Sequence, residues 1–160
     1  MIIHQATEAD AEAITALIAA NSTDRGGRIS REFTGAQVRA ALAGSMPVVV
    51  AKSGHEVVGV LFTSDRENTV SPSVSAMLKA WPGADNAYVY GPVCIAESHR
   101  GRGILRMLFD DVKRQLPGRE AVLFIQKSND ISRVAHSRLG MREVAHFVHN
   151  GEDFLVFSAR

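Results

Sequence analysis

The chain has 160 residues and a formal net charge of +1 at pH 7, and 46% of its residues are hydrophobic. This length predicts a single domain over residues 1–160 that can bury a core, and the near-neutral charge argues against nucleic acid as a partner. The single cysteine, Cys94, excludes an intrachain disulfide framework and a cysteine-rich zinc site. Because no apolar run reaches transmembrane length and no signal-peptide pattern is present, we expect no membrane partner and a cytoplasmic location.

The first half of the chain mixes short apolar strands with amphipathic helices. Thr7 is the predicted N-cap of the first helix, with Asp10 in the capping-box position and Ile14 in the apolar stripe. Residues 21–34 are polar and contain a Gly-Gly pair, which predicts a loop or a broken helix. The pattern further predicts a strand at 2–6, a helix at 35–43, and apolar strands at 47–51 and 56–62.

The second half begins with a long polar connection over 65–86, in which 73–80 can form a short helix. Asn150-Gly151 is a strong signal for a type I′ hairpin turn. The other predicted elements are strands at 87–95, 121–125, 142–149 and 152–158, and helices that begin after Gly103 and at Asn129. The fold class is therefore α/β: a mixed central sheet of about seven strands with helices on both faces.

The most informative segment joins the strand at 87–95 to the helix that follows it. It contains a turn with two glycines, Gly101 and Gly103, before an amphipathic helix whose predicted apolar face is Leu105, Leu108, Phe109, Val112 and Leu116. Glycines at a helix N-terminus let a ligand approach unpaired backbone N–H groups, and the helix dipole favours an anion there. With Arg100, Arg102 and Arg106 nearby, the turn predicts a cradle for a pyrophosphate.

Two common phosphate motifs fit this segment poorly. The dinucleotide fingerprint G-x-G-x-x-G requires a glycine where this chain has Arg106, and the P-loop sequence is absent. A dinucleotide-binding module is therefore only a distant alternative.

The segment Arg100-Gly101-Arg102-Gly103-Ile104-Leu105 instead resembles the acyl-CoA motif of the GNAT acyltransferases, [RQ]-x-x-G-x-[GA] after a strand. Leu105 stands where the family usually has Gly or Ala. A second segment, residues 129–141, resembles the family's later Asn-led helix, which ends in a Leu-Gly-Phe-like turn. The resemblance implies the GNAT fold, with a mostly antiparallel sheet, and acetyl transfer from acetyl-CoA to a primary amine by direct attack within a ternary complex. The acceptor would be a small molecule or a peptide, no metal is implied, and the protein would be a monomer or a homodimer.

The resemblance also assigns residues to the site. The pyrophosphate would bind Arg100, Gly101, Arg102, Gly103, Ile104 and Leu105, the pantetheine arm would pair with Val93, Cys94 and Ile95, and Asn129 would join the cofactor-binding set. His136 stands where the family often has the tyrosine that protonates the departing thiolate. We expect His136 to donate that proton, directly or through a water, and Tyr90 to reach the acyl end.

Structural roles remain open for these side chains. His136 can be a buried helical histidine with one hydrogen bond, Tyr90 a half-buried strand aromatic, and Cys94 a small core residue rather than a nucleophile. The departures at Leu105 and His136 also leave a second class of function open, a non-catalytic acyl-CoA-binding sensor or regulatory module.

Overall fold

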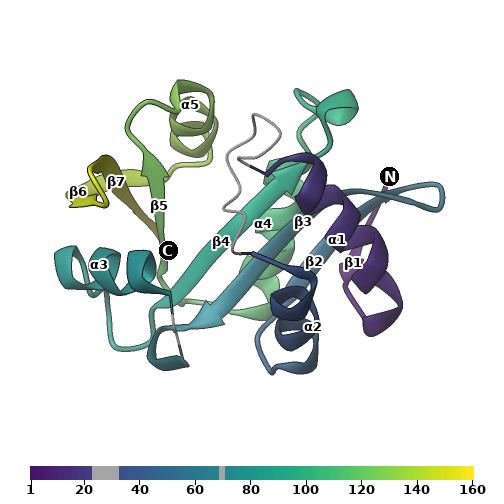
Figure 1. Cartoon of the computed structure of the whole chain (residues 1–160), viewed down its shortest axis with the longest axis horizontal. Coiled ribbons are helices and arrows are strands. Elements are labelled where there is room, and N and C mark those ends of the chain that lie inside the picture. The colour runs from purple at the N-terminus through teal and green to yellow at the C-terminus, as the bar shows by residue number, and fades with distance from the viewer. Residues whose placement is uncertain (23–32, 69–70) are drawn as a thin grey trace. The chain divides into compact units, whose positions relative to one another are not determined.

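The computed structural model describes residues 1–22, 33–68 and 71–160. The predicted loop at 21–34 falls largely outside the described residues. The elements, drawn in Figure 1, are β1 (Ile2–Gln5), η1 (Glu8–Asp10), α1 (Ala11–Ala20), α2 (Gly35–Ala43), β2 (Val48–Ser53), β3 (Glu56–Asp65), η3 (Arg66–Asn68), α3 (Pro72–Ala80), β4 (Tyr88–Ile95), η4 (Glu97–His99), α4 (Ile104–Gln115), β5 (Ala121–Gln126), α5 (Asp130–Arg138), β6 (Arg142–His149) and β7 (Glu152–Ala159).

The strands form one seven-stranded sheet in the order β1-β2-β3-β4-β5-β7-β6. β4 and β5 pair in parallel, whereas β1 with β2, β2 with β3, β5 with β7, and β6 with β7 pair antiparallel. The predicted mixed, mostly antiparallel sheet is confirmed. In the part of the chain that the structure describes, no helix is long and apolar enough to cross a bilayer.

The contacts divide the chain into two compact units. Unit 1 consists of Met1–Thr63 and Gly91–Pro117, and unit 2 consists of Ser64–Tyr90 and Gly118–Arg160. Strand β4 begins in unit 2 and ends in unit 1, so one continuous strand supplies residues to both.

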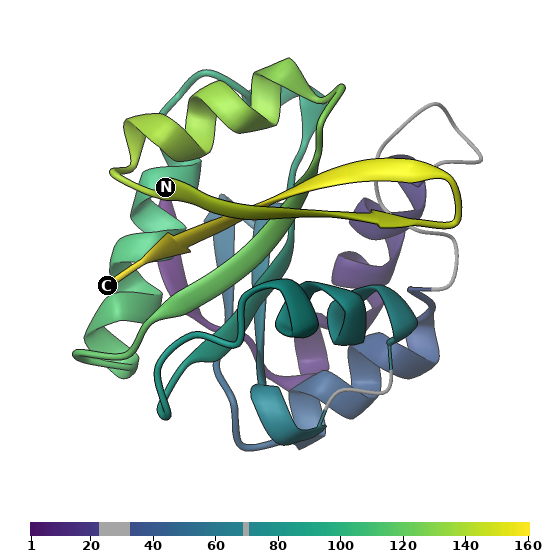
Figure 2. The ribbon, with the colours of Figure 1, turned by 90° about the vertical axis from the view of Figure 1, so that its left-hand side faces the viewer.

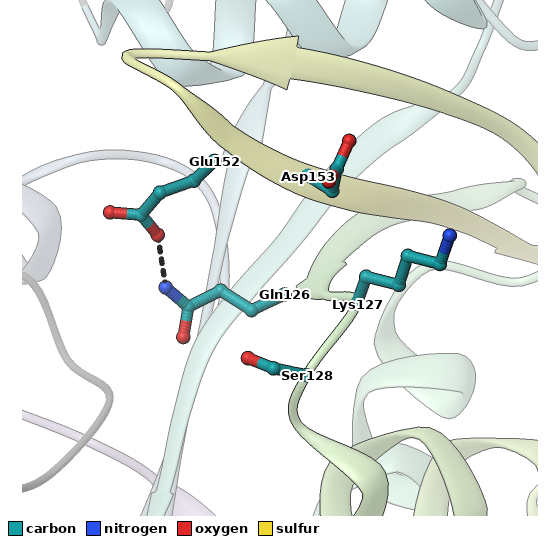
Figure 3. A pocket seen from close by; sticks show the side chains of 5 residues that line it. All are labelled: Gln126, Lys127, Ser128, Glu152 and Asp153. Carbon is teal, nitrogen blue, oxygen red and sulfur yellow. Dashed lines mark hydrogen bonds between the residues drawn. The ribbon is translucent and has the colours of Figure 1, made fainter.

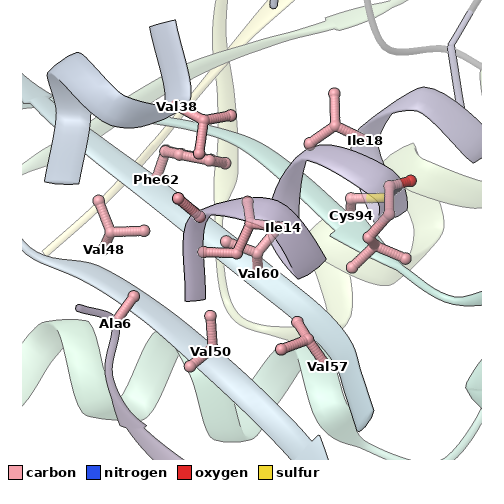
Figure 4. Close-up of a cluster of buried hydrophobic side chains, with 12 residues drawn as sticks. Ala6, Ile14, Ile18, Val38, Val48, Val50, Val57, Val60, Phe62 and Cys94 are labelled. Carbon is pink, nitrogen blue, oxygen red and sulfur yellow. Dashed lines mark hydrogen bonds between the residues drawn. The ribbon is translucent and has the colours of Figure 1, made fainter. Parts of the chain in front are cut away.

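Unit 1 is a three-layer arrangement. In Figure 1, α1 and α2 lie in front of β2 and β3, and α4 lies behind them. Alternate strand residues such as Val48 and Val50 point towards α1 and α2 and form a hydrophobic cluster with Ile14 and Val38, shown in Figure 4. The near-continuous apolar character of both strands follows from this arrangement, because helices cover both faces.

Helix α4 lies close to β3 because β3 has a glycine at the contact. A Cβ placed on Gly59 would lie 3.1 Å from Cγ2 of Ile104 and 3.4 Å from Cδ1 of Leu108, both on α4. The expected apolar face of α4 needs one correction: Ile104 is 2% exposed and belongs to the buried stripe, whereas Leu105 is only half-buried. The difference arises because the first residue of the helix is the one that packs against the glycine.

Unit 2 also has a helix on each face of its strands. Figure 2 shows the β6–β7 hairpin between α5 and α3. Met77 of α3 packs on Val89, Val122 and Phe154 in the second hydrophobic cluster, while the neighbouring β4 residue, Tyr90, points to the opposite face, where α5 lies. The side chains of the successive β4 residues Val89 and Tyr90 therefore point to opposite faces of the sheet.

Capping and turn residues in the sequence mark where most helices and strands begin and end. Asn150 and Gly151 have φ angles of 52° and 77°, which confirms the predicted type I′ hairpin. Asp10 accepts a hydrogen bond from the N–H of Thr7 at 3.0 Å, as the capping box predicts, although the first turn is the 3₁₀ segment η1. Helix α3 begins at Pro72 rather than at residue 73, because Ser71 caps it and proline fits the first helical position.

The buried cluster of unit 1 should dominate stability. Ile14 is fully buried, so Ile14→Ala should lower the free energy of unfolding by about 2–5 kcal/mol through lost burial and a cavity. Ile131, which is 85% exposed, is the matched control, and Ile131→Ala should change stability by less than about 0.5 kcal/mol. Urea unfolding measures both, and similar losses for the two variants would contradict the assignment of the core.

One buried carboxylate organises the start of β5 in unit 2. Glu120 is 4% exposed. It accepts hydrogen bonds from Trp81 Nε1–H at 2.9 Å, from the N–H of Ala84 at 2.8 Å and from the hydroxyl of Ser158 at 2.5 Å. Burial by itself raises the pKa of Glu120, but these hydrogen bonds and the nearby charge of Arg160 together outweigh burial, and the net pKa lies below 4.5.

Glu120→Gln should therefore destabilise the protein in a pH-dependent way. An amide keeps one acceptor oxygen and turns its NH₂ towards the remaining donors, so the variant should lose about 1–3 kcal/mol near neutral pH. Because the folded pKa is lowered, the carboxylate's contribution is present above pH 4.5 and is lost as the pH falls through the folded pKa. Urea unfolding of both proteins from neutral to acidic pH should show the difference shrinking, and a difference that stays constant would refute this account.

Candidate active site

The turn before α4 has the backbone geometry that its glycines suggest. Gly101 and Gly103 have φ angles of 75° and 77°, in the left-handed region that side-chain-bearing residues rarely adopt. A Cβ added at either position would meet no atom within 4 Å. The backbone of this turn therefore lies open to a ligand.

The N-terminus of α4 has no side-chain cap. Gly103 is its N-cap residue, and no side chain accepts a hydrogen bond from the first turn. By contrast, Ser71 caps α3 and Asn129 caps α5. The first N–H groups of any helix lack intrahelical acceptors, and here they add to the positive end of the helix dipole. An anion can supply the missing acceptors.

Arg100 connects this turn to two other elements of unit 1. Its Nε–H donates to the carbonyl oxygen of Ile95 at 3.2 Å, at the end of β4, and its Nη2 donates to Oδ1 of Asn21 at 2.6 Å. Asn21 in turn donates to the carbonyl oxygen of Leu17, on α1, at 2.9 Å. The guanidinium thus supports the shape of the turn, a role that the sequence did not indicate. Arg102 and Arg106 lie exposed on the same segment.

The predicted β4 residues are placed differently from one another. Val93 and Ile95 are half-buried, whereas Cys94 is 5% exposed and belongs to the cluster of unit 1 in Figure 4. Its Sγ lies 3.8 Å from the carbonyl oxygen of Leu17, and burial raises the pKa of the thiol to about 11. The side chains of Cys94 and Ile104 are therefore core residues, and only their backbone groups are available to a ligand.

The other predicted residues lie in unit 2. Oη of Tyr90 is 3.0 Å from Nε2 of His136, and the two rings meet edge to face. Both residues are 3% exposed, and burial raises the pKa of Tyr90 and lowers the pKa of His136. Asn129 acts as the N-cap of α5, with its Oδ1 accepting from the N–H of Ser132 at 3.3 Å.

Sequence reasoning did not identify a polar depression beside the start of α5. It has a volume of about 310 Å³ and is lined by Gln126, Lys127, Ser128, Glu152 and Asp153. Figure 3 shows the hydrogen bond from Gln126 to Glu152 across it. The only sequence signal is the polar run after β5. Within 1–22, 33–68 and 71–160, no group of three or more His, Cys, Asp or Glu side chains is arranged to hold a metal ion.

Several solved structures with the same fold are named as acetyltransferases. Protein smu.2055 from Streptococcus mutans superposes with a TM-score of 0.76 at 20% identity, over 99% of this chain and 98% of that one. A ribosomal-protein-alanine N-acetyltransferase from Brucella melitensis gives 0.70 at 20% identity over 99% of each chain. YncA from Salmonella typhimurium, a putative acetyltransferase solved with acetyl-CoA, gives 0.69 at 21% identity over 100% of this chain and 93% of that one.

No protein of curated function matches the sequence at a significant level. The model of the acetyltransferase (GNAT) family, however, matches residues 14–141, a span that contains the glycine turn, the Tyr90–His136 pair and the cap of α5. The chain therefore belongs to the GNAT family of acetyltransferases.

Proposed function

We propose that this protein is an N-acetyltransferase that moves the acetyl group of acetyl-CoA to a primary amine by direct attack within a ternary complex. The observation that carries the proposal is the uncapped N-terminus of α4 behind the open glycine turn. Backbone N–H groups of Gly101 to Leu105 would bind the pyrophosphate, since such a helix start favours a dianionic group. Support for this donor also comes from YncA, which was solved with acetyl-CoA.

The remaining predicted residues fit the rest of the donor. The amides of the pantetheine arm would pair with the backbone of Val93–Ile95, which needs no side chain and so agrees with the burial of Cys94. An N–H of this segment would polarise the thioester carbonyl, which develops negative charge when an amine attacks it. Orientation of the two substrates would supply much of the rate.

We assign the proton transfers to His136 and Tyr90. They are in hydrogen-bond contact, they are nearly fully buried, and both have a pKa shifted by burial. The acceptor is proposed as a small molecule or a peptide with a primary amine. The Brucella protein is named a ribosomal-protein-alanine N-acetyltransferase, and a peptide beginning with alanine therefore belongs in the first acceptor panel.

The pyrophosphate assignment is tested by adding a negative charge to the turn. Gly103→Asp should weaken CoA binding at least about tenfold, or about 1.4 kcal/mol, through repulsion and the strain of a side chain at positive φ. Gly118→Asp is the matched control, because Gly118 follows the other end of α4 with a similar φ of 73° and equally open surroundings. Isothermal calorimetry should show near wild-type CoA affinity for the control. A folded Gly103→Asp protein with unchanged affinity would refute the assignment.

Turnover separates the enzyme from a CoA-binding sensor. Acetyl-CoA is incubated with putrescine, glycine methyl ester or an alanine-initiated peptide, and the released thiol is measured. Thiol release that depends on the amine supports transfer. CoA binding without release for any amine favours the sensor, which the departures at Leu105 and His136 keep as the second candidate.

Direct transfer also predicts that Cys94 takes no part in the chemistry. With a pKa of about 11 rather than 9.0, its thiolate at pH 8 should be about 100-fold scarcer than in the unfolded chain. Iodoacetamide labelling, measured by mass spectrometry, should be slower in the native protein by at least that factor, and Cys94→Ala should retain amine acetylation. Fast native labelling, or a folded Cys94→Ala protein without activity, would favour an acyl-enzyme instead.

A further inference from the structure

The C-terminal end of α1 is joined to the end of β4 by a ring of contacts within unit 1. Asn21, the C-cap residue of α1, donates through Nδ2 to the carbonyl oxygen of Leu17 at 2.9 Å. Its Oδ1 accepts from Nη2 of Arg100 at 2.6 Å, and Nε of Arg100 donates to the carbonyl oxygen of Ile95 at 3.2 Å. The neighbouring Cys94 closes the ring, because its Sγ lies 3.8 Å from the carbonyl oxygen of Leu17.

The orientation of Asn21 in this ring is determined by its two partners. Leu17 and Cys94 are buried in the same hydrophobic cluster, so the ring is anchored in the core. Asn21 has to bridge a carbonyl oxygen, which only accepts, and a guanidinium, which only donates. A side-chain amide carries one group of each kind, and only one orientation of it satisfies both partners. The position of Oδ1, and of the guanidinium that it binds, is thereby set.

The carbonyl group of Ile95 lies on the side of β4 that the donor would use. The N–H of Ala96 donates to the carbonyl oxygen of Val58, on β3, at 2.8 Å. In a trans peptide the C=O points opposite to the N–H of the next residue, so the C=O of Ile95 points away from β3. Since β3 occupies one edge of β4, the amides of the pantetheine arm would pair along the other edge. Arg100 therefore binds the strand on the donor's side.

We propose that Asn21 is a positioning residue for the acyl donor: it holds Arg100 at the end of β4 and so fixes the glycine turn relative to the strand edge. The inference rests on the proposed binding of acetyl-CoA. The pyrophosphate and the pantetheine arm are parts of one molecule, so the turn and the strand edge must keep a fixed separation to bind both at once. A site that is already ordered pays less entropy when the ligand binds. Asn21 therefore contributes to CoA affinity without touching CoA.

Arg100 has two separable effects on the donor. Its positive charge acts on a pyrophosphate whether or not Asn21 is present, whereas its hold on the end of β4 depends on Asn21. The guanidinium lies at the C-terminal end of α1, where the negative end of the helix dipole favours a cation, which adds to the hydrogen bond with Asn21. Arg102 is exposed on the same turn and is the matched comparison for charge alone.

A double-mutant cycle on CoA affinity tests the proposal. In isothermal calorimetry, Asn21→Ala should weaken CoA binding about tenfold in the wild-type background but less than about twofold in the Arg100→Ala background. In the Arg102→Ala background it should keep its full effect. Urea unfolding establishes that each variant is folded under the assay conditions, and a loss of stability alone would not depend on Arg100. An Asn21→Ala protein with wild-type affinity, or with the same loss in both arginine backgrounds, overturns the proposal.

The positioning can also be measured without a ligand. In nitrogen-15 NMR of the wild-type protein, the Nε–H of Arg100, identified by its loss in Arg100→Ala, should exchange slowly with water. Asn21→Ala should speed this exchange and shift the amide signals of Gly101 and Gly103, whereas Arg102→Ala should leave the Nε–H exchange unchanged. An Nε–H that exchanges equally slowly in Asn21→Ala overturns the proposal. Failure of the proposed function looks different: wild-type protein that binds no CoA would refute the donor assignment and this inference with it.

Discussion

The glycine in the middle of β3 is the constraint on which the candidate donor site of unit 1 depends. A side chain at Gly59 would have to share its space with Ile104 and Leu108 of α4, and with Cδ1 of Ile95 at 3.2 Å. Its absence lets α4 pack directly on the strand, with the first residue of the helix buried. The position of the helix N-terminus, and of the glycine turn before it, is therefore set by packing of the core. A turn held in this way can present its N–H groups without reorganising, which is what rigid binding of a polyanion requires.

Much of this arrangement could be predicted from local signals. The spacing of apolar residues predicted the strands and helices. These patterns are strong because helices cover both faces of the strands in each unit. The hairpin at Asn150-Gly151 and the helix cap at Asn129 could also be predicted, because an Asn-Gly pair strongly favours a type I′ turn and asparagine is a preferred N-cap residue. Gly59 was harder, since a glycine inside an apolar strand indicates a close approach but not by which element. For the same reason, the first residue of the apolar face of α4 was predicted as Leu105, whereas Ile104 is the buried one; Leu108 and Val112 are buried as predicted.

The polar contacts could not be predicted because they join residues far apart in sequence. The pattern showed that Arg100 was near a glycine turn, but not that Asn21 would accept its hydrogen bond. Both His136 and Tyr90 were candidates on separate grounds, and only the fold shows them in contact, 46 residues apart. The structural role of Glu120 likewise could not be predicted, because its three hydrogen-bond donors come from other parts of the chain.

The uncapped start of α4 has a consequence for how stability is distributed in the chain. A serine, threonine, aspartate or asparagine at the N-cap would satisfy one of the orphan N–H groups, and glycine there forgoes roughly a few tenths of a kcal/mol. The chain has this small deficit at α4, directly after the glycine turn. Side chains cap α3 and α5, whereas α1 and α2, like α4, have no side-chain cap hydrogen bond. Proteins commonly hold binding surfaces below their attainable stability in this way. A helix end whose N–H groups were satisfied by a side-chain cap would be more stable, but it would leave fewer unpaired N–H groups to bind an anion.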